Sequence, residues 1–231
     1  RLATDVATEL ENIQRIMLRA VSAGNMNSTL RVAILPTFAS LWLIPRLPEF
    51  LSQNQGVELS FSTRLKPFDL NAEKFDIAIH FGKSNWPNTR MRAFFSERMI
   101  PVASPDLVEK HRIRSFEDTG DVPLLHISSR PTAWQDYFEA IRFHGRTYLT
   151  GRYFDQFSMV IAAAKASLGV ALLPKYFIGS EIENGDLVVL GDRHLMTDNS
   201  YYFVTPLDQR DDTVEKFYEW IHAQATAGKD S

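Results

Sequence analysis

The sequence predicts an α/β fold of two Rossmann-like lobes that are joined by two crossover strands and preceded by a helix. Apolar strand patterns alternate with helix patterns, and this strand–helix–strand order occurs twice along the chain. Apolar residues at spacings of three and four over about residues 2–23 predict the preceding helix. Strands separated by helices form parallel sheets, and two such lobes enclose a cleft.

The predicted N-terminal helix has a single apolar seam and ends near Gly24. Its seam residues are Ala3, Val6, Leu10, Ile13, Met17 and Ala20. The seam either packs on the body of its own chain or pairs with a second copy and joins an upstream segment. The predicted helix lies within residues 1–27.

The first strand, residues 30–35, runs into a turn that contains Thr37 and Ser40. Two prolines follow, and because proline fits the first turn of a helix, we expect the helix to span about residues 44–54. Backbone N–H groups at a helix start lack intrahelical partners and can bind a polar or anionic ligand. The alternative is an ordinary strand–helix connection.

The rest of the chain continues the alternation. Predicted strands cover residues 57–63, 75–81, 91–102, 123–127, 146–154, 170–173, 187–190 and 201–205, and predicted helices cover residues 105–110, 133–143, 156–167 and 213–225. The long extended stretch at 91–102 takes the chain from one lobe to the other, and the strand at 201–205 brings it back. Asp155 is the expected cap of the helix at 156–167.

Composition excludes several classes of protein. The chain has 231 residues and is 45% hydrophobic, but no apolar run approaches the roughly 18 to 20 residues that cross a bilayer. The N-terminal segment of the chain lacks the basic and apolar pattern of a secretory signal peptide, so we expect a cytoplasmic protein without membrane attachment. The absence of cysteine excludes disulfides and thiolate chemistry, and the net charge of -3 argues against binding of phosphate backbones. Residue 1 is Arg, and we interpret the chain as a fragment.

Catalytic motifs are absent from the sequence. It contains no glycine-rich phosphate loop, nucleophile elbow or metalloprotease pattern, and the six histidines lack metal-ligand spacing. We therefore predict no catalytic residue, no metal and no cofactor. His80 and His126 end predicted strands on the cleft side, where each is either a hydrogen-bonded structural residue or a ligand contact.

Five segments in order resemble the regulatory part of LysR-type transcriptional regulators. They are Thr37-Phe38-Ala39-Ser40, Trp42-Leu43-Ile44-Pro45-Arg46-Leu47, FDIAIHFG at 75–82, PVASPDL at 101–107 and VIAAAKASLGVALLP at 160–174. The resemblance spans essentially the whole chain, and it is strongest to the subgroup that contains the glycine-cleavage and β-lactamase regulators. It implies a fold like that of type 2 periplasmic binding proteins, with a winged helix-turn-helix upstream.

The resemblance also implies the lobe boundaries and the effector site. It implies that residues 1–27 form a linker and dimerisation helix, that residues 28–99 and 201–231 form lobe I, and that residues 100–200 form lobe II. The implied effector-binding residues are Thr37, Phe38, Ser40, His80, Phe81, Ile100, His126, Ser128, Asp155, Gln156 and Phe157. The sequence departs from the subgroup at His80, where relatives often have Arg, and at Ser167, where they have Gly or Ala. A neutral His does not pair with a carboxylate as Arg does, which argues against an anionic effector.

We therefore expect the effector-sensing and dimerisation part of a transcriptional regulator. Its expected partners are a small polar metabolite, a second copy of the chain, with a tetramer for the full-length protein, and operator DNA through the upstream domain. A solute-binding receptor of a transport system would share the fold and is the alternative. A lyase or dehydratase on this fold would need an acid–base pair, but Asp69, His80 and Asp155 have no spacing that links them.

Overall fold

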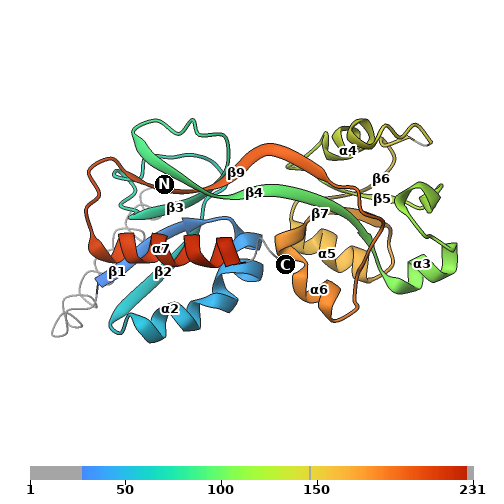
Figure 1. Cartoon of the computed structure of the whole chain (residues 1–231). Coiled ribbons are helices and arrows are strands. Elements are labelled where there is room, and N and C mark those ends of the chain that lie inside the picture. Colours follow the sequence, from blue (N-terminus) through green and yellow to red (C-terminus); the bar gives the residue numbers. More distant parts are fainter. Residues whose placement is uncertain (1–27, 146, 228–231) are drawn as a thin grey trace, which may run out of the picture.

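The computed structural model describes residues 28–145 and 147–227 and shows two α/β lobes that share one mixed sheet (Figure 1). The strand order is β2-β1-β3-β9-β4-β7-β5-β6, and β8 (Val188–Val189) pairs with β4. One lobe contains β1 (Ser28–Ile34), β2 (Val57–Thr63) and β3 (Ile77–Gly82); the other contains β5 (Leu124–Ile127), β6 (Gly151–Phe154) and β7 (Val170–Pro174). The predicted helix at 1–27 lies outside the described residues.

Two long strands connect the lobes. β4 (Thr89–Ala103) and β9 (Leu195–Pro206) pair antiparallel, with irregularities between Ala93 and Phe95 and between Ser96 and Arg98. Figure 1 shows both strands running from one lobe into the other. The predicted two-lobed α/β fold with two crossover strands is thereby confirmed. The predicted lobe boundaries, between residues 99 and 100 and between residues 200 and 201, fall inside these continuous strands.

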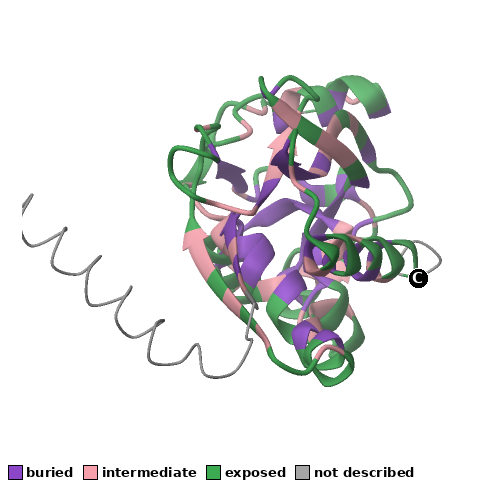
Figure 2. Cartoon of the chain, turned by 90° about the vertical axis from the view of Figure 1, so that its left-hand side faces the viewer, coloured by how far each residue is buried: buried purple, intermediate pink, exposed green. Residues whose placement is uncertain are grey.

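The first lobe buries both faces of its sheet. In β1, Leu30 and Val32 lie in the main core, beneath α2 (Leu47–Gln53) and α7 (Asp212–Ala227). Phe50 of α2 contacts the α7 rings of Phe217 and Trp220 at centroid distances of 5.0 and 5.3 Å. The other face is covered by a second cluster, which consists of Ala33, Leu70, Ala78, Trp86 and Val204 with Phe68, Phe75, Met91 and Tyr202. Figure 2 shows the buried residues gathered between the sheet and its covering segments.

The second lobe has helices on both sides of β5 and β7. They are α3 (Pro105–His111), α4 (Ala133–Ile141), α5 (Phe157–Lys165) and α6 (Gly179–Glu183). α4 lies on one side of these strands and α5 on the other (Figure 1). β5 is parallel to both β6 and β7, as expected for strands connected through helices. Among the described residues, no helix is long and apolar enough to span a membrane.

The predicted start of the first-lobe helix is wrong. The expected start near residue 44 lies inside a continuous run of helical turns, in which a π-helix (Phe38–Leu43) and a 3-10 turn (Ile44–Arg46) precede α2. Pro45 has no N–H group to donate, and its ring would clash in a regular α-helical interior. The change from π to 3-10 hydrogen bonding at this point accommodates the proline without breaking the run.

Two further expectations of the second lobe are corrected. The strand expected at 146–154 is restricted to Gly151–Phe154, and α5 begins after Gln156, so Asp155 is not its N-cap residue. α5 ends before Ser167, which has a left-handed φ of 60°. The Ser167 hydroxyl lies 2.8 Å from the hydroxyl of Ser104, the N-cap residue of α3. This contact gives Ser167 a structural role at the position where it departs from the subgroup.

Candidate functional site

A buried polar cluster lies where the two lobes meet. Glu97 of β4 is 1% exposed, and its Oε2 accepts a hydrogen bond of 3.0 Å from the Thr197 hydroxyl of β9. Arg130, in the loop between β5 and α4, places Nη2 3.5 Å from Glu97 Oε1. Both crossover strands and the second lobe therefore contribute to one charged cluster, and its carboxylate is almost completely removed from water.

Arg130 also contacts an aromatic side chain of the first lobe. Its guanidinium carbon lies 4.0 Å from the ring centroid of Phe81, at the end of β3. The same guanidinium lies 5.8 Å from the ring of Phe157, the first residue of α5. Arginine stacks well on aromatic faces because its planar charge is weakly hydrated. One side chain thus connects the carboxyl end of β3 in one lobe with the start of α5 in the other.

Burial controls protonation in this cluster. Burial raises the pKa of Glu97, and the charge of Arg130 and the hydrogen bond from Thr197 oppose that rise. Burial also raises the pKa values of Tyr176 and Tyr201, whose rings are 5.8 Å apart. Both phenols therefore stay neutral near pH 7, and Glu97 with Arg130 is the ion pair of the cluster.

A cavity of about 330 Å³ adjoins Arg130 and Thr197. Its lining is Lys83, Met99, Arg130, Thr132, Ala133, Asp136, Leu195, Met196, Thr197, Asp198 and Asn199. Lys83 follows β3 of the first lobe, whereas Arg130 to Asp136 belong to the second lobe, so the cavity lies between the lobes. Its volume lies within the range of small-molecule sites, roughly 300 to 1,000 Å³.

The family model for the LysR substrate binding domain matches residues 23–226 of the chain. The chain belongs to this family. The glycine cleavage system transcriptional activator of Escherichia coli K12 is 33% identical over 211 residues, which cover 90% of this chain and 69% of the relative. The regulator BlaA of Proteus vulgaris is 30% identical over 224 residues, or 95% of this chain and 74% of the relative. The chain is therefore the effector-binding domain of a LysR-type transcriptional regulator.

Solved structures agree with this assignment. The effector domain of AmpR from Pseudomonas aeruginosa superposes with a TM-score of 0.75 at 26% identity, over 87% of this chain and 97% of that one. CrgA from Neisseria meningitidis, at 18% identity, has a TM-score of 0.70 over 95% of this chain and 78% of that one, and it supports the fold alone. The relatives described here are transcriptional regulators.

In this LysR substrate-binding domain, the turn after β1 is packed rather than open. Thr37 is 6% exposed and makes no side-chain cap hydrogen bond, and the Ala39 N–H already donates to the Leu35 carbonyl at 3.0 Å. The Phe38 ring is completely buried. Ser40 is exposed, and its hydroxyl donates to the Thr37 carbonyl at 3.3 Å. The turn therefore presents one exposed hydroxyl and a largely buried threonine, and at least one of the backbone N–H groups expected to be free, that of Ala39, is already bonded.

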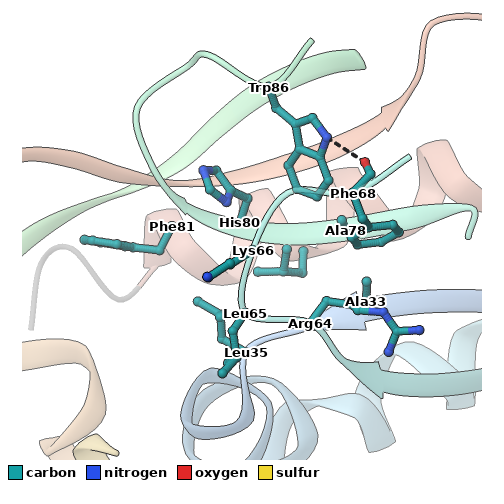
Figure 3. A pocket seen from close by; sticks show the side chains of 11 residues that line it. Ala33, Leu35, Arg64, Leu65, Lys66, Phe68, Ala78, His80, Phe81 and Trp86 are labelled. Atoms are coloured by element: carbon teal, nitrogen blue, oxygen red, sulfur yellow. Dashed lines mark hydrogen bonds between the residues drawn. The ribbon is translucent and has the colours of Figure 1, made fainter. Parts of the chain in front are cut away.

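The two residues at the end of β3 have different surroundings. Figure 3 shows His80 beside Trp86, with Phe81 extending away from them, and the His80 and Trp86 ring centroids are 5.3 Å apart. His80 is half-buried, and burial lowers its pKa. The adjacent hollow has a volume of only about 20 Å³, although Arg64 and Lys66 also line it. A hollow of this size holds about one water molecule rather than a metabolite.

The second-lobe residues of the predicted site lie together at the ends of β5 and β6. The Ser128 N–H donates to the Phe154 carbonyl at 2.7 Å, which brings Ser128 close to Asp155. Ser128 and Asp155 are exposed, Gln156 is half-buried, and Phe157 is buried. His126 stacks on Tyr153 at 4.4 Å, and burial lowers its pKa.

Ile100 of β4 is buried in the core. The two groups of predicted residues meet through Arg130, which the prediction missed along with Glu97, Thr197, Tyr176 and Tyr201. One pattern in the sequence could have identified Glu97, because it is an acidic residue within the largely apolar crossover stretch FFSERMIPVA, residues 94–103. No group of three or more candidate metal ligands occurs among the described residues.

Proposed function

We propose that this domain binds a small polar metabolite between its lobes and that binding changes the relative orientation of the lobes. The contact of Arg130 with Glu97 and Phe81 supports the proposal, since a side chain of the second lobe contacts both a crossover strand and the first lobe. A ligand can shift such an equilibrium only through its different affinities for the two arrangements. Lobe rotation would then change the spacing of attached DNA-binding modules.

The proposed contacts include polar residues on both sides of the cleft. Thr37, Ser40, His80 and Phe81 belong to the first-lobe side, and Ser128, Asp155 and Gln156 to the second-lobe side. Hydroxyl, amide and carboxylate groups suit a hydrogen-bonding metabolite better than an apolar one. We propose no catalytic residue among them, no cofactor and no reaction.

We further propose a homodimer in which α2 of one chain lies antiparallel to α5 of its partner. Ile44 and Leu51 on the first-lobe helical run are 49% and 39% exposed, and Met159 on α5 is 49% exposed. An isologous contact between the two helices would cover these apolar side chains twice, once in each copy. Sedimentation of the 231-residue chain at tens of micromolar should give a dimer, and the double substitution Ile44→Glu and Met159→Glu should give a monomer that still folds.

In this proposal an upstream domain recognises DNA. The full-length protein is a tetramer, and it is located in the cytoplasm. Acidic residues outnumber basic ones, 28 to 25, in this chain. Phosphate contacts dominate the affinity of proteins for DNA, so the 231-residue chain should not shift a specific duplex even at low salt. The proposed lobes are residues 28–99 with 201–231 and residues 100–200.

A melting-temperature screen tests the sensing role. Amino acids, organic acids, amines, sugars and nucleosides are added singly to the 231-residue chain, because a ligand that binds only the folded state raises its melting temperature. We expect a small set of related polar compounds to do so, and calorimetry should give one site per chain. If no class of metabolite binds, the proposed sensing role is wrong.

A further inference from the structure

The cavity between the lobes has charges of both signs in equal number. Lys83 and Arg130 are its two cationic residues, and Asp136 and Asp198 are its two acidic residues. Behind Arg130 lies the buried carboxylate of Glu97. Lys83 and Asp198 already pair with each other at 3.6 Å, so a ligand with only negative charge would approach Asp136 and Glu97. A ligand with only positive charge would approach Arg130. A ligand with one charge of each sign avoids both repulsions.

The contact between Glu97 and Arg130 leaves hydrogen-bonding capacity unused. The two side chains form an ion pair at 3.5 Å, yet neither Glu97 Oε1 nor Arg130 Nε has a hydrogen-bond partner among the described residues, and both atoms are buried. Arg130 Nη1 donates to the carbonyl of the adjacent Ser129. Buried polar atoms without partners are costly, so a ligand that supplies a donor to Glu97 and an acceptor to Arg130 would gain at both ends.

We propose that Glu97 and Arg130 form a charge-matched subsite for a small zwitterion of the α-amino-acid class, an inference that rests on the proposed sensing function. The ammonium group of the ligand replaces the Arg130 guanidinium opposite Glu97 Oε1. Arg130, which already lines the cavity, then pairs through its guanidinium with the ligand carboxylate by two parallel hydrogen bonds. Thr197 keeps Glu97 in place through its bond to Oε2.

Calorimetry with matched ligands tests the subsite without altering the protein. The common α-amino acids are titrated one at a time into the 231-residue chain. Each amino acid that binds is compared with its amide, which lacks the carboxylate, and with its hydroxy-acid analogue, which lacks the ammonium group. We expect both analogues to bind at least about tenfold more weakly, since each loses a charge-assisted hydrogen bond.

Two substitutions test the assignment of each charge. Glu97→Gln keeps the side-chain size and the acceptor for Thr197 but removes the charge, so it should weaken zwitterion binding at least about tenfold and strengthen binding of the hydroxy acid. Arg130→Lys should weaken binding of every ligand that carries a carboxylate, because the ammonium group cannot pair through a fork. Glu109→Gln on α3 and Arg98→Gln on β4 are matched controls, since both residues are exposed and neither lines the cavity.

The outcomes separate the subsite from the sensing function. Binding of a neutral or singly charged metabolite without binding of any amino acid would overturn the subsite and leave the sensing function standing. Equal affinity for an amino acid, its amide and its hydroxy acid would also overturn the subsite. If no compound of any class binds, both proposals are wrong. Selective binding of a zwitterion that is weakened by Glu97→Gln and unchanged by Glu109→Gln would support the subsite.

Discussion

The two walls of the cleft are built differently. In the first lobe, Phe38 stacks on Trp42 at 4.9 Å and on Tyr201 at 4.5 Å, so aromatic packing fixes the turn after β1. In the second lobe, a backbone hydrogen bond from Ser128 to Phe154 joins the strand ends, and polar side chains there are exposed. The first wall is therefore a packed surface in which only the Ser40 side chain is fully exposed, whereas Ser128 and Asp155 are both exposed on the second. If the domain binds a metabolite as proposed, this contrast predicts that the second lobe makes most of the polar contacts and that closure brings the ligand against the first lobe.

The largest expected effect comes from the packed wall. Phe38→Ala removes a completely buried ring and should lower the free energy of unfolding by about 3 to 5 kcal/mol. Ser128→Ala, on the other wall, removes an exposed hydroxyl and should change it by less than about 0.5 kcal/mol. Denaturant unfolding measures both changes. Equal effects of the two substitutions would contradict the contrast between the walls.

A smaller effect tests the backbone of the second wall. A Cβ at Gly151 would lie 2.1 Å from the Leu124 carbonyl oxygen and 2.8 Å from the His126 ring. Gly151→Ala must therefore separate β5 from β6, and it should cost about 1 to 3 kcal/mol of stability. Gly179→Ala is the control, because a Cβ there meets no atom within 4 Å. Unchanged stability of Gly151→Ala would show that these strand ends are loosely held.

Thr37 is the most direct polar test of the first wall. Its side chain makes no cap hydrogen bond, so Thr37→Val should change stability little. If Thr37 binds the effector, affinity should fall by about 0.5 to 1.5 kcal/mol, or up to about 3 kcal/mol for a charged ligand atom. Calorimetry with the compound found by screening measures the change. Unchanged affinity would remove Thr37 from the site.

The pH dependence of stability distinguishes the buried groups. Burial lowers the pKa values of His80 and His126 below the ordinary 6.5. The unfolded chain therefore binds more protons than the folded protein, and the stability of the fold decreases as the pH drops below about 6.5. Burial raises the pKa of Glu97, so the folded state holds this proton more tightly than the unfolded chain. The resulting stabilisation of the fold is complete below about pH 4.5 and is lost as the pH rises through the folded-state pKa. Glu97→Gln should therefore gain stability relative to the wild type as the pH rises from 4.5 to 7. An unchanged difference between the two proteins would mean that Glu97 is not desolvated.

The sequence predicted those parts of the fold that depend on local pattern. Strand β2 was predicted at its observed limits of 57–63, and the last helix, predicted at 213–225, is observed at Asp212–Ala227. The helix start near residue 44 was wrong, because π and 3-10 turns keep the chain helical past Pro45. Arg130 and Glu97 are 33 positions apart, and no periodicity connects a loop residue of one lobe with a crossover strand.

Hydrogen–deuterium exchange on the 231-residue chain tests most directly whether one ligand engages both walls. The probe is the compound that gives the largest rise in melting temperature in the screen. We predict slower exchange at 37–43 in the first lobe and at 128–130 and 154–159 in the second, with both lobes protected at the same ligand concentration. Protection of only one lobe, or protection confined to a surface away from β3, β4 and α5, would contradict the account.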